Sequence, residues 1–238
     1  MARQRPGSCF ARIRWQGLTE SCRGVVVRLV KTTGGRRMVT IITREAGKIG
    51  AGSSISEKGK SKSALAVRPF SLSLFRLEEK RKGFVWIKSA EVIDSHFALA
   101  EDADRYAEAA FALEFTDRLL PEGIAAEGIF DLLTAHLSLL SSRKRNFRLA
   151  TVAFLIKVFD ISGIMPDEGS IRSALLPSNG DFDIFAIVEF IRNNPLDRLS
   201  GLTLEPAKCN AIYSFLRGFA EEHLEIGKLK SDVLSKRT

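Results

Sequence analysis

The sequence predicts an α+β protein in which a small five-stranded β-barrel is followed by an all-helical domain. Three observations support this. Apolar residues alternate with the period of strands up to about residue 90, they recur with the 3.6-residue period of helices from about residue 100, and the net charge changes sign between the two regions. The predicted division is a basic leader at 1–20 that is a candidate for disorder, a barrel domain at 21–97 and a helical domain at 98–238.

The barrel is predicted from short β-branched runs separated by turn residues. Two runs around Gly34-Gly35 are typical of a β-hairpin, a polar loop is expected at 53–63, and the turn at Lys80–Gly83 leads into the last strand. Five short strands in about 70 residues favour the closed five-stranded barrel of the OB-fold. The predicted extended segments are 25–30, 36–43, 49–54, 65–77 and 84–87.

The helices are predicted from apolar stripes and from the Gly and Pro residues that end them. The segment 182–191 is apolar nearly all round, which predicts a buried helix. The other predicted helices are amphipathic. The helical segments begin and end near 106–117, 129–140, 147–158, 182–191 and 205–224.

Positive charge is concentrated in the first third of the chain. The whole protein has 36 Lys and Arg against 28 Asp and Glu, for a net charge of +8. Residues 22–90 hold an excess of twelve basic side chains, whereas residues 91–238 are net acidic by seven. A cationic excess of this size suits a polyanion, because each cation placed on a phosphate releases condensed counterions. The barrel is therefore the predicted nucleic-acid-binding part.

The candidate DNA-binding residues are the cations of the predicted barrel. Four aromatic residues, Phe70, Phe75, Phe84 and Trp86, could stack on bases, but most are interpreted as core. Phosphate contacts should then dominate, and binding should be insensitive to sequence and steep in salt. The candidates are Arg28, Lys31, Arg36, Arg37, Arg44, Lys48, Lys58, Lys60, Lys62 and Arg68.

Motifs for catalysis, metals and membranes are missing from the sequence. The histidines, His96, His136 and His223, lie singly in structural segments, and no Walker A loop or nucleophile elbow occurs. The three cysteines lack metal-ligand spacing and make no disulfide framework, which favours a reducing compartment. No apolar run is long enough to span a bilayer. We therefore expect a cytoplasmic protein that is not an enzyme and has no metal or cofactor.

Several segments, in order along the chain, resemble the bacterial RecO family of DNA repair and recombination mediators. The motif T-x-x-x-G-K-[ILV] at 43–49 is the first, and a basic loop ending in Lys-Ser follows at the distance seen in that family. The segment 167–180 lacks the four cysteines of the family's zinc module, so the chain resembles the metal-free branch. The similar segments are Thr43–Ile49, Lys58–Ser63, Arg68–Phe70, Ala90–Ser95, Leu113–Gly123 and Leu229–Ser231.

The resemblance implies a nucleoid-associated, non-catalytic protein that binds single- and double-stranded DNA and anneals complementary strands. With RecR, such a protein helps to load RecA onto DNA covered by single-strand-binding protein, and it docks on the acidic tail of that protein. A basic cluster at the start of the third helix is the candidate site for the acidic tail, because cations there oppose the helix dipole. The cluster consists of Arg143, Lys144, Arg145 and Arg148.

Two other functions agree with the same sequence features. The barrel could be a protein-interaction adaptor that binds an acidic partner without direct contact with nucleic acid, which a gel shift with single-stranded DNA would test. The barrel could also bind RNA, and competition between matched DNA and RNA oligonucleotides would decide between the two polymers.

Overall fold

A computed structural model describes the chain from residue 21 onward with short gaps. The described residues are 21–32, 36–56, 58–59, 61–81, 83–142, 146–179, 184–224, 226 and 229–231. The predicted basic leader at 1–20 lies outside the described residues.

The first half folds as a closed five-stranded barrel, which confirms the predicted OB-fold architecture. The strand order around the barrel is β1-β2-β3-β5-β4, and β4 closes the barrel on β1. All neighbours are antiparallel except β3 and β5, which pair in parallel. The elements are β1 (Ser21–Lys31), β2 (Arg37–Thr43), β3 (Gly47–Ser53), the short helix α1 (Lys62–Ala66), β4 (Leu72–Arg81) and β5 (Phe84–Asp94).

Alternation along the strands separates the inside of the barrel from its outer face. Val39 and Ile41 of β2 are fully buried in the barrel core, whereas the alternate residues Met38 and Thr40 face outward. The outward positions of each strand therefore form a continuous outer face whose surroundings decide what it can bind.

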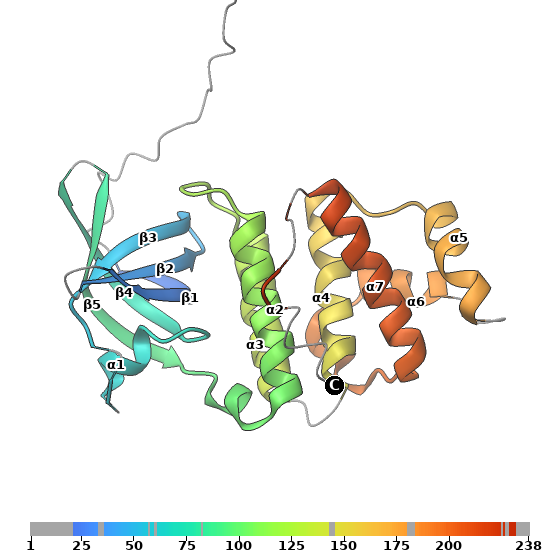
Figure 1. The fold of residues 1–238 in the computed structure, drawn as a ribbon, viewed down its shortest axis with the longest axis horizontal. Coiled ribbons are helices and arrows are strands. Elements are labelled where there is room, and N and C mark those ends of the chain that lie inside the picture. The colour runs from blue at the N-terminus through green and yellow to red at the C-terminus, as the bar shows by residue number, and fades with distance from the viewer. Residues whose placement is uncertain are drawn as a thin grey trace, which may run out of the picture.

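The second half is helical and packs against one side of the barrel (Figure 1). Helices α2 and α3 lie between the barrel and the remaining long helices. None of the helices in the described part of the chain is long and apolar enough to span a membrane. The elements are η1 (Phe97–Glu101), α2 (Ala103–Leu119), α3 (Glu127–Ser142), α4 (Phe147–Ser162), α5 (Glu168–Asn179), α6 (Ile184–Asn193), η2 (Leu196–Gly201) and α7 (Pro206–His223).

One hydrophobic cluster continues from the helices onto the outer face of the barrel. Val25 of β1 and Ile42 of β2 are completely buried, and they belong to the same cluster as the core residues of α2, α3 and α4. The two residues are register partners. Since both face outward from the barrel, the helical half covers this end of the sheet.

The predicted extended segment at 65–77 is wrong in its first part. Residues 62–66 form α1, in which the Ser61 side chain accepts a hydrogen bond from the backbone N–H of Ala64 and so caps the helix. Ala64 and Ala66 are buried, and β4 begins only at Leu72. The opposite error occurs in the last strand, which the pattern places at 84–87 but which runs to Asp94, because pairing with β4 extends along its whole length.

The predicted helix at 182–191 exists as α6, but it is not buried all round. Ile184, Val188 and Ile191 are buried on one face, while Phe190 is about half exposed. Their i, i+4, i+7 spacing is that of an amphipathic surface helix. The structure also contains α5, a helix that the apolar pattern did not predict.

Candidate nucleic-acid interface

The T-x-x-x-G-K motif forms the tight turn by which the barrel meets the helices. The Thr43 hydroxyl accepts the backbone N–H of Ala46 at 3.2 Å and donates to the carbonyl of Gly47 at 3.0 Å. Gly47 has φ +66°, and a Cβ added there would lie 1.8 Å from the carbonyl oxygen of Ile124. The position therefore requires glycine for both its conformation and its close contact with the helical half.

Lys48 and Arg44 are bound by the helical half. The Lys48 ammonium donates to the carbonyl of Asp117 at 2.5 Å and lies 3.4 Å from its carboxylate. The Arg44 guanidinium contacts the Asp131 carboxylate at 3.1 Å and that of Glu127 at 2.8 Å. The hydrogen bond to Asp131 raises the pKa of Arg44 above its usual value. Because carboxylates of α2 and α3 match both charges, we leave these two predicted candidates out of the proposed DNA-contact set.

Other segments that resemble the RecO family also meet one another in space. The backbone N–H of Gly123, which follows α2, donates to the carbonyl of Lys48 at 3.0 Å. The backbone N–H groups of Lys230 and Ser231 donate to the Glu114 carboxylate on α2 at 2.9 and 2.8 Å. These segments therefore have a structural role in joining distant parts of the chain.

The Pro-Phe segment, Arg68–Phe70, also lies where the barrel meets the helices. Phe70 has a positive φ of 74°, and its ring lies edge-on to Tyr106 of α2 with centroids 5.2 Å apart. Its carbonyl is 2.9 Å from Nδ1 of His96, the buried residue between β5 and η1. We call this region, where the helices cover the barrel, the joint end.

The opposite end of the barrel, which we call the open end, holds the β1–β2 and β4–β5 connections and the end of β3. The register places Lys31 opposite Arg37, and Arg37 opposite Ser53 at the end of β3. The register thus brings these two positively charged side chains together at this end of the barrel.

The remaining predicted barrel cations are distributed along the outer face and around α1. Arg28 and Arg36 are exposed, and the carbonyl of Arg36 is tied to Thr32 at the hairpin tip. Lys58 and Lys62 are exposed on either side of the cap of α1, and the Arg68 guanidinium holds the intervening loop through the Gly59 carbonyl at 2.7 Å. Lys60 lies outside the described residues.

The structure adds Lys80, near the β4–β5 turn, to the candidate interface. The sequence pattern predicts only a turn in this segment, although it holds three consecutive cations. Pairing of Gly52 with Trp86 brings the β4–β5 hairpin to the same end of the barrel as the β1–β2 hairpin. The parallel pairing of β3 with β5 joins strands that are distant in the sequence, which explains why a local pattern did not reveal it.

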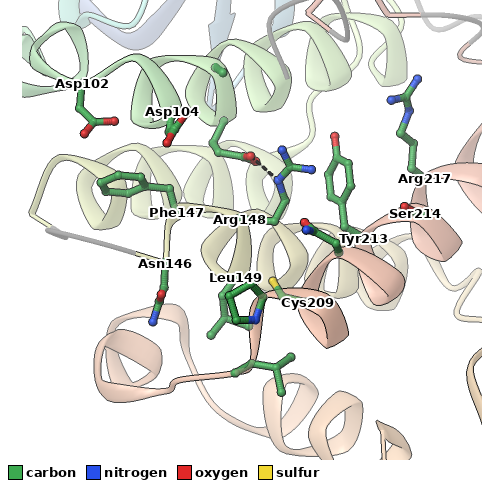
Figure 2. Close-up of a pocket in the computed structure, with 15 residues that line it drawn as sticks. Asp102, Asp104, Asn146, Phe147, Arg148, Leu149, Cys209, Tyr213, Ser214 and Arg217 are labelled. Carbon is green, nitrogen blue, oxygen red and sulfur yellow. Dashed lines mark hydrogen bonds and ion pairs between the residues drawn. The ribbon is translucent and has the colours of Figure 1, made fainter. Parts of the chain in front are cut away.

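A pocket of about 720 Å³ lies in the helical half, at the start of α4 (Figure 2). Arg148 projects into it, its guanidinium bound to the buried Glu108 carboxylate and 4.2 Å from the centroid of the Tyr213 ring. Burial raises the pKa of Glu108 in spite of the attraction of Arg148. Asp102 and Asp104 also line the pocket, so its described charges are not mainly positive.

The predicted acidic-tail cluster is therefore only partly visible. The charge of Arg148 is matched by Glu108, whereas Arg143, Lys144 and Arg145 lie outside the described residues. In the described part of the chain, no group of three or more His, Cys, Asp or Glu side chains could hold a metal ion.

The fold is that of a two-part protein with a small OB-type barrel joined to a helical half, and comparison with known proteins identifies the family. Residues 18–96 match the family described as Recombination protein O N terminal, and residues 100–169 match Recombination protein O C terminal. The chain belongs to the RecO family of DNA repair proteins.

Individual relatives agree with this assignment. The chain is 32% identical to the DNA repair protein RecO of Alkaliphilus metalliredigens over 145 residues, which covers 60% of this chain and 58% of the relative. It is 30% identical to that of Pelotomaculum thermopropionicum over 227 residues, covering 84% and 88%. It is 25% identical to that of Desulforudis audaxviator, covering 84% and 90%. The first of these matches spans little more than half of the relative's length.

Proposed function

We propose that this chain is a recombination mediator that binds single- and double-stranded DNA through the cations at the open end of its barrel and around α1, and anneals complementary strands. The observation that carries the proposal is the arrangement of cations in this RecO-family barrel. Arg28, Arg36, Lys58 and Lys62 are exposed, and Lys31 and Arg37 are opposed across the hairpin. If these cations neutralise phosphates without binding the bases, two complementary strands can approach each other and pair.

The proposed function includes action with RecR to load RecA onto DNA coated by single-strand-binding protein. Membership of the RecO family supports this part. For the acidic tail of single-strand-binding protein, the proposed docking region is the start of α4 with the pocket beside it. Because Glu108 already matches Arg148, the basic residues 143–145 would supply most of the charge.

The central experiment measures DNA binding and strand annealing by the full chain. A fluorescence anisotropy titration with single-stranded and duplex DNA at several salt concentrations gives the affinity and its salt dependence. Replacing Arg28, Arg36, Lys58 and Lys62 together by Ala should weaken binding to unrelated sequences equally and reduce the salt slope by roughly 0.7 to 0.9 per lost phosphate contact. Annealing should fall in parallel, with and without single-strand-binding protein on the strands.

A binding experiment with an acidic peptide separates the remaining alternatives. If the wild-type chain binds no DNA at low salt but binds an acidic partner, the protein is an adaptor and the mediator proposal is wrong. For the tail site, a labelled peptide ending in acidic and apolar residues should lose affinity when Arg143, Lys144 and Arg145 are replaced by Ala. A larger loss in the Arg148→Ala variant would contradict the assignment to residues 143–145.

A further inference from the structure

An aromatic pair lies on the outer face of the barrel at the open end. Val85 and Ile87 of β5 are buried in the barrel core, so the alternation of the strand turns Trp86 outward. Phe84, at the start of β5, is 39% exposed, and the centroids of the Phe84 and Trp86 rings are 6.2 Å apart. These two side chains do not belong to the core to which the sequence pattern assigned most of the aromatics.

Because Gly52 has no side chain, the two rings can lie close to the sheet. It is the register partner of Trp86 on the parallel strand β3. A Cβ on Gly52 would lie 2.5 Å from Cε3 of Trp86 and 3.1 Å from Cζ of Phe84. A Cβ on Gly50, the preceding outward position of β3, would meet no atom within 4 Å, so this stretch of the strand is bare. Glycine at position 52 marks a close approach to a neighbouring group.

The rings end an apolar band that crosses four strands. Val30 of β1 pairs with Met38 of β2, Met38 pairs with Gly52, and Gly52 pairs with Trp86. Paired residues share one face of a sheet, and Val30 is 45% exposed. The band is therefore the uncovered counterpart of the Val25 and Ile42 pair, which the helices bury at the joint end.

Cations lie close to this band. Arg28 is two residues before Val30 on the same face of β1, and Lys31 and Arg37 form the next register pair toward the end of the hairpin, at positions that alternate with those of the band. The Lys80 ammonium lies 4.5 Å from the centroid of the Trp86 ring, and the β4–β5 register shifts between Glu79 and Arg81, beside that lysine. Such an irregularity re-aims a side chain.

Two carboxylates, those of Glu78 and Glu79, lie near the rings, and only Glu79 has a role in the turn. The Glu79 carboxylate accepts the backbone N–H of Gly83 at 2.6 Å and so stabilises the hairpin turn. Glu78 is the register partner of Trp86 and is exposed. Among the described residues around the band, cations outnumber carboxylates, and the ligand chemistry that suits it has flat apolar faces together with regularly spaced negative charges. Single-stranded nucleic acid has both, whereas a duplex keeps its base faces stacked inside.

We propose that Trp86, supported by Phe84 and Gly52, is a stacking platform for unpaired bases and gives the open end a preference for single strands over duplexes. This inference rests on the proposed DNA-binding function and names the chemistry of its ligand. When a base stacks on the ring, the Lys80 ammonium leaves the ring face and contacts the adjacent phosphate. The cations hold both kinds of DNA, and the ring distinguishes between them.

Tryptophan fluorescence tests the platform directly, because the chain contains only Trp15 and Trp86. In a Trp15→Phe variant, all tryptophan emission comes from Trp86. Titration with oligo(dT) should quench this emission to saturation. A duplex, or an abasic oligonucleotide with the same number of phosphates, should bind with little quenching, because neither presents an unpaired base.

Affinity measurements give an independent test. Trp86→Ala should weaken binding of oligo(dT) by about tenfold or more, with little change in duplex affinity and none in the salt slope. Trp86→Phe should restore most of the affinity, which a purely structural role of the indole would not explain. Arg36→Ala is the matched control: it should reduce the salt slope for single strands and duplexes alike.

The outcomes separate this inference from the function on which it rests. Binding of oligo(dT) with unchanged Trp86 emission, or equal losses for single strands and duplexes in Trp86→Ala, would overturn the platform and leave the mediator proposal standing. Absence of binding to any of the three polymers at low salt would overturn both.

Discussion

The two ends of the barrel's outer face are built from the same strands but have different surroundings. At the joint end, Val25 and Ile42 are buried under the helices, and Lys48 is paired with Asp117. At the open end, Val30 and the ring of Phe84 are exposed, and cations lie around them. The comparison teaches that a basic residue of this barrel acquires its role from what covers it, because a carboxylate within ion-pair distance cancels its attraction for a polyanion.

The largest effect on stability is expected from a substitution that prevents the barrel and the helical half from packing together. Gly47→Ala forces a side chain into the left-handed region and against the Ile124 carbonyl, so the free energy of unfolding should fall by about 3 kcal/mol or more. Urea denaturation measures the loss. Gly50→Ala, on the same strand but in open space, is the control and should change stability by less than about 1 kcal/mol. Equal losses would show that the joint does not depend on this contact.

The free energy of unfolding should decrease at acid pH because of one buried histidine in the helical half. His136 of α3 is fully buried, stacked on Phe154, and burial lowers its pKa from 6.5 to about 3. Folding thus favours the neutral ring, so its contribution to stability is present above pH 6.5 and is lost as the pH falls toward 3. At pH 5 the loss should be about 2 kcal/mol, from 1.36 kcal/mol per pKa unit.

The variant His136→Leu removes this titration. Between pH 8 and pH 5, the free energy of unfolding should decrease in both proteins, but the decrease in the variant should be smaller than that in the wild type by about 2 kcal/mol. Thermal or urea unfolding at the two pH values measures the difference, and the pH 8 value controls for the change in packing. A variant whose stability falls as steeply as that of the wild type would contradict the role of His136.

Single arginine substitutions at the two ends give the most direct comparison. Arg36→Ala at the open end should weaken DNA binding several-fold and reduce the salt slope by roughly 0.7 to 0.9, since one phosphate contact is lost. Arg44→Ala at the joint end should leave the slope unchanged, because Asp131 and Glu127 already hold this guanidinium. If both variants lose slope equally, Arg44 exchanges its carboxylates for phosphates and the distinction between the ends fails.

The smallest effect concerns an ion pair of the joint. Asp117→Asn removes the carboxylate beside Lys48 but keeps the backbone carbonyl that accepts its hydrogen bond, so we expect a loss of about 1 kcal/mol at most. Glu168→Gln, which breaks the more exposed pair with Arg172 on α5, should cost about 0.5 kcal/mol or less. Chemical denaturation at low and high salt checks both values; a larger loss in the α5 variant would contradict the proposed importance of the joint.

Much of the architecture could be predicted because it depends on short-range patterns. The β-branched runs around Gly34-Gly35 predicted the β1–β2 hairpin, and the 3.6-residue period predicted α2, α3, α4 and α7. The prediction failed at α1, where a capping Ser61 and two small buried alanines override an extended pattern. A five-residue helix has too few turns for a period to be visible in the sequence.

The segments that resemble the RecO family were recognised from sequence, but their role was not. From sequence, Arg44 and Lys48 of Thr43–Ile49 are candidate DNA-binding residues; in the structure Lys48 contacts Asp117 of α2, and Gly47 lies against Ile124, which follows α2. Lys230 and Ser231 bind Glu114 through backbone N–H groups, which no side-chain pattern reveals. The outward position of Trp86 likewise depends on pairing between β3 and β5, strands that are separated by α1 and β4.

The sequence by itself determined the barrel, the succession of helices and the unequal distribution of charge, because strand alternation, helical period and composition are properties of neighbouring residues. Only the tertiary structure decided which cations remain exposed. Arg44 and Asp131 are 87 residues apart in the chain and meet because the helices fold back onto one end of the barrel. Coulombic attraction depends on distance in space, so the same kind of side chain is neutralised at the joint end and exposed at the open end.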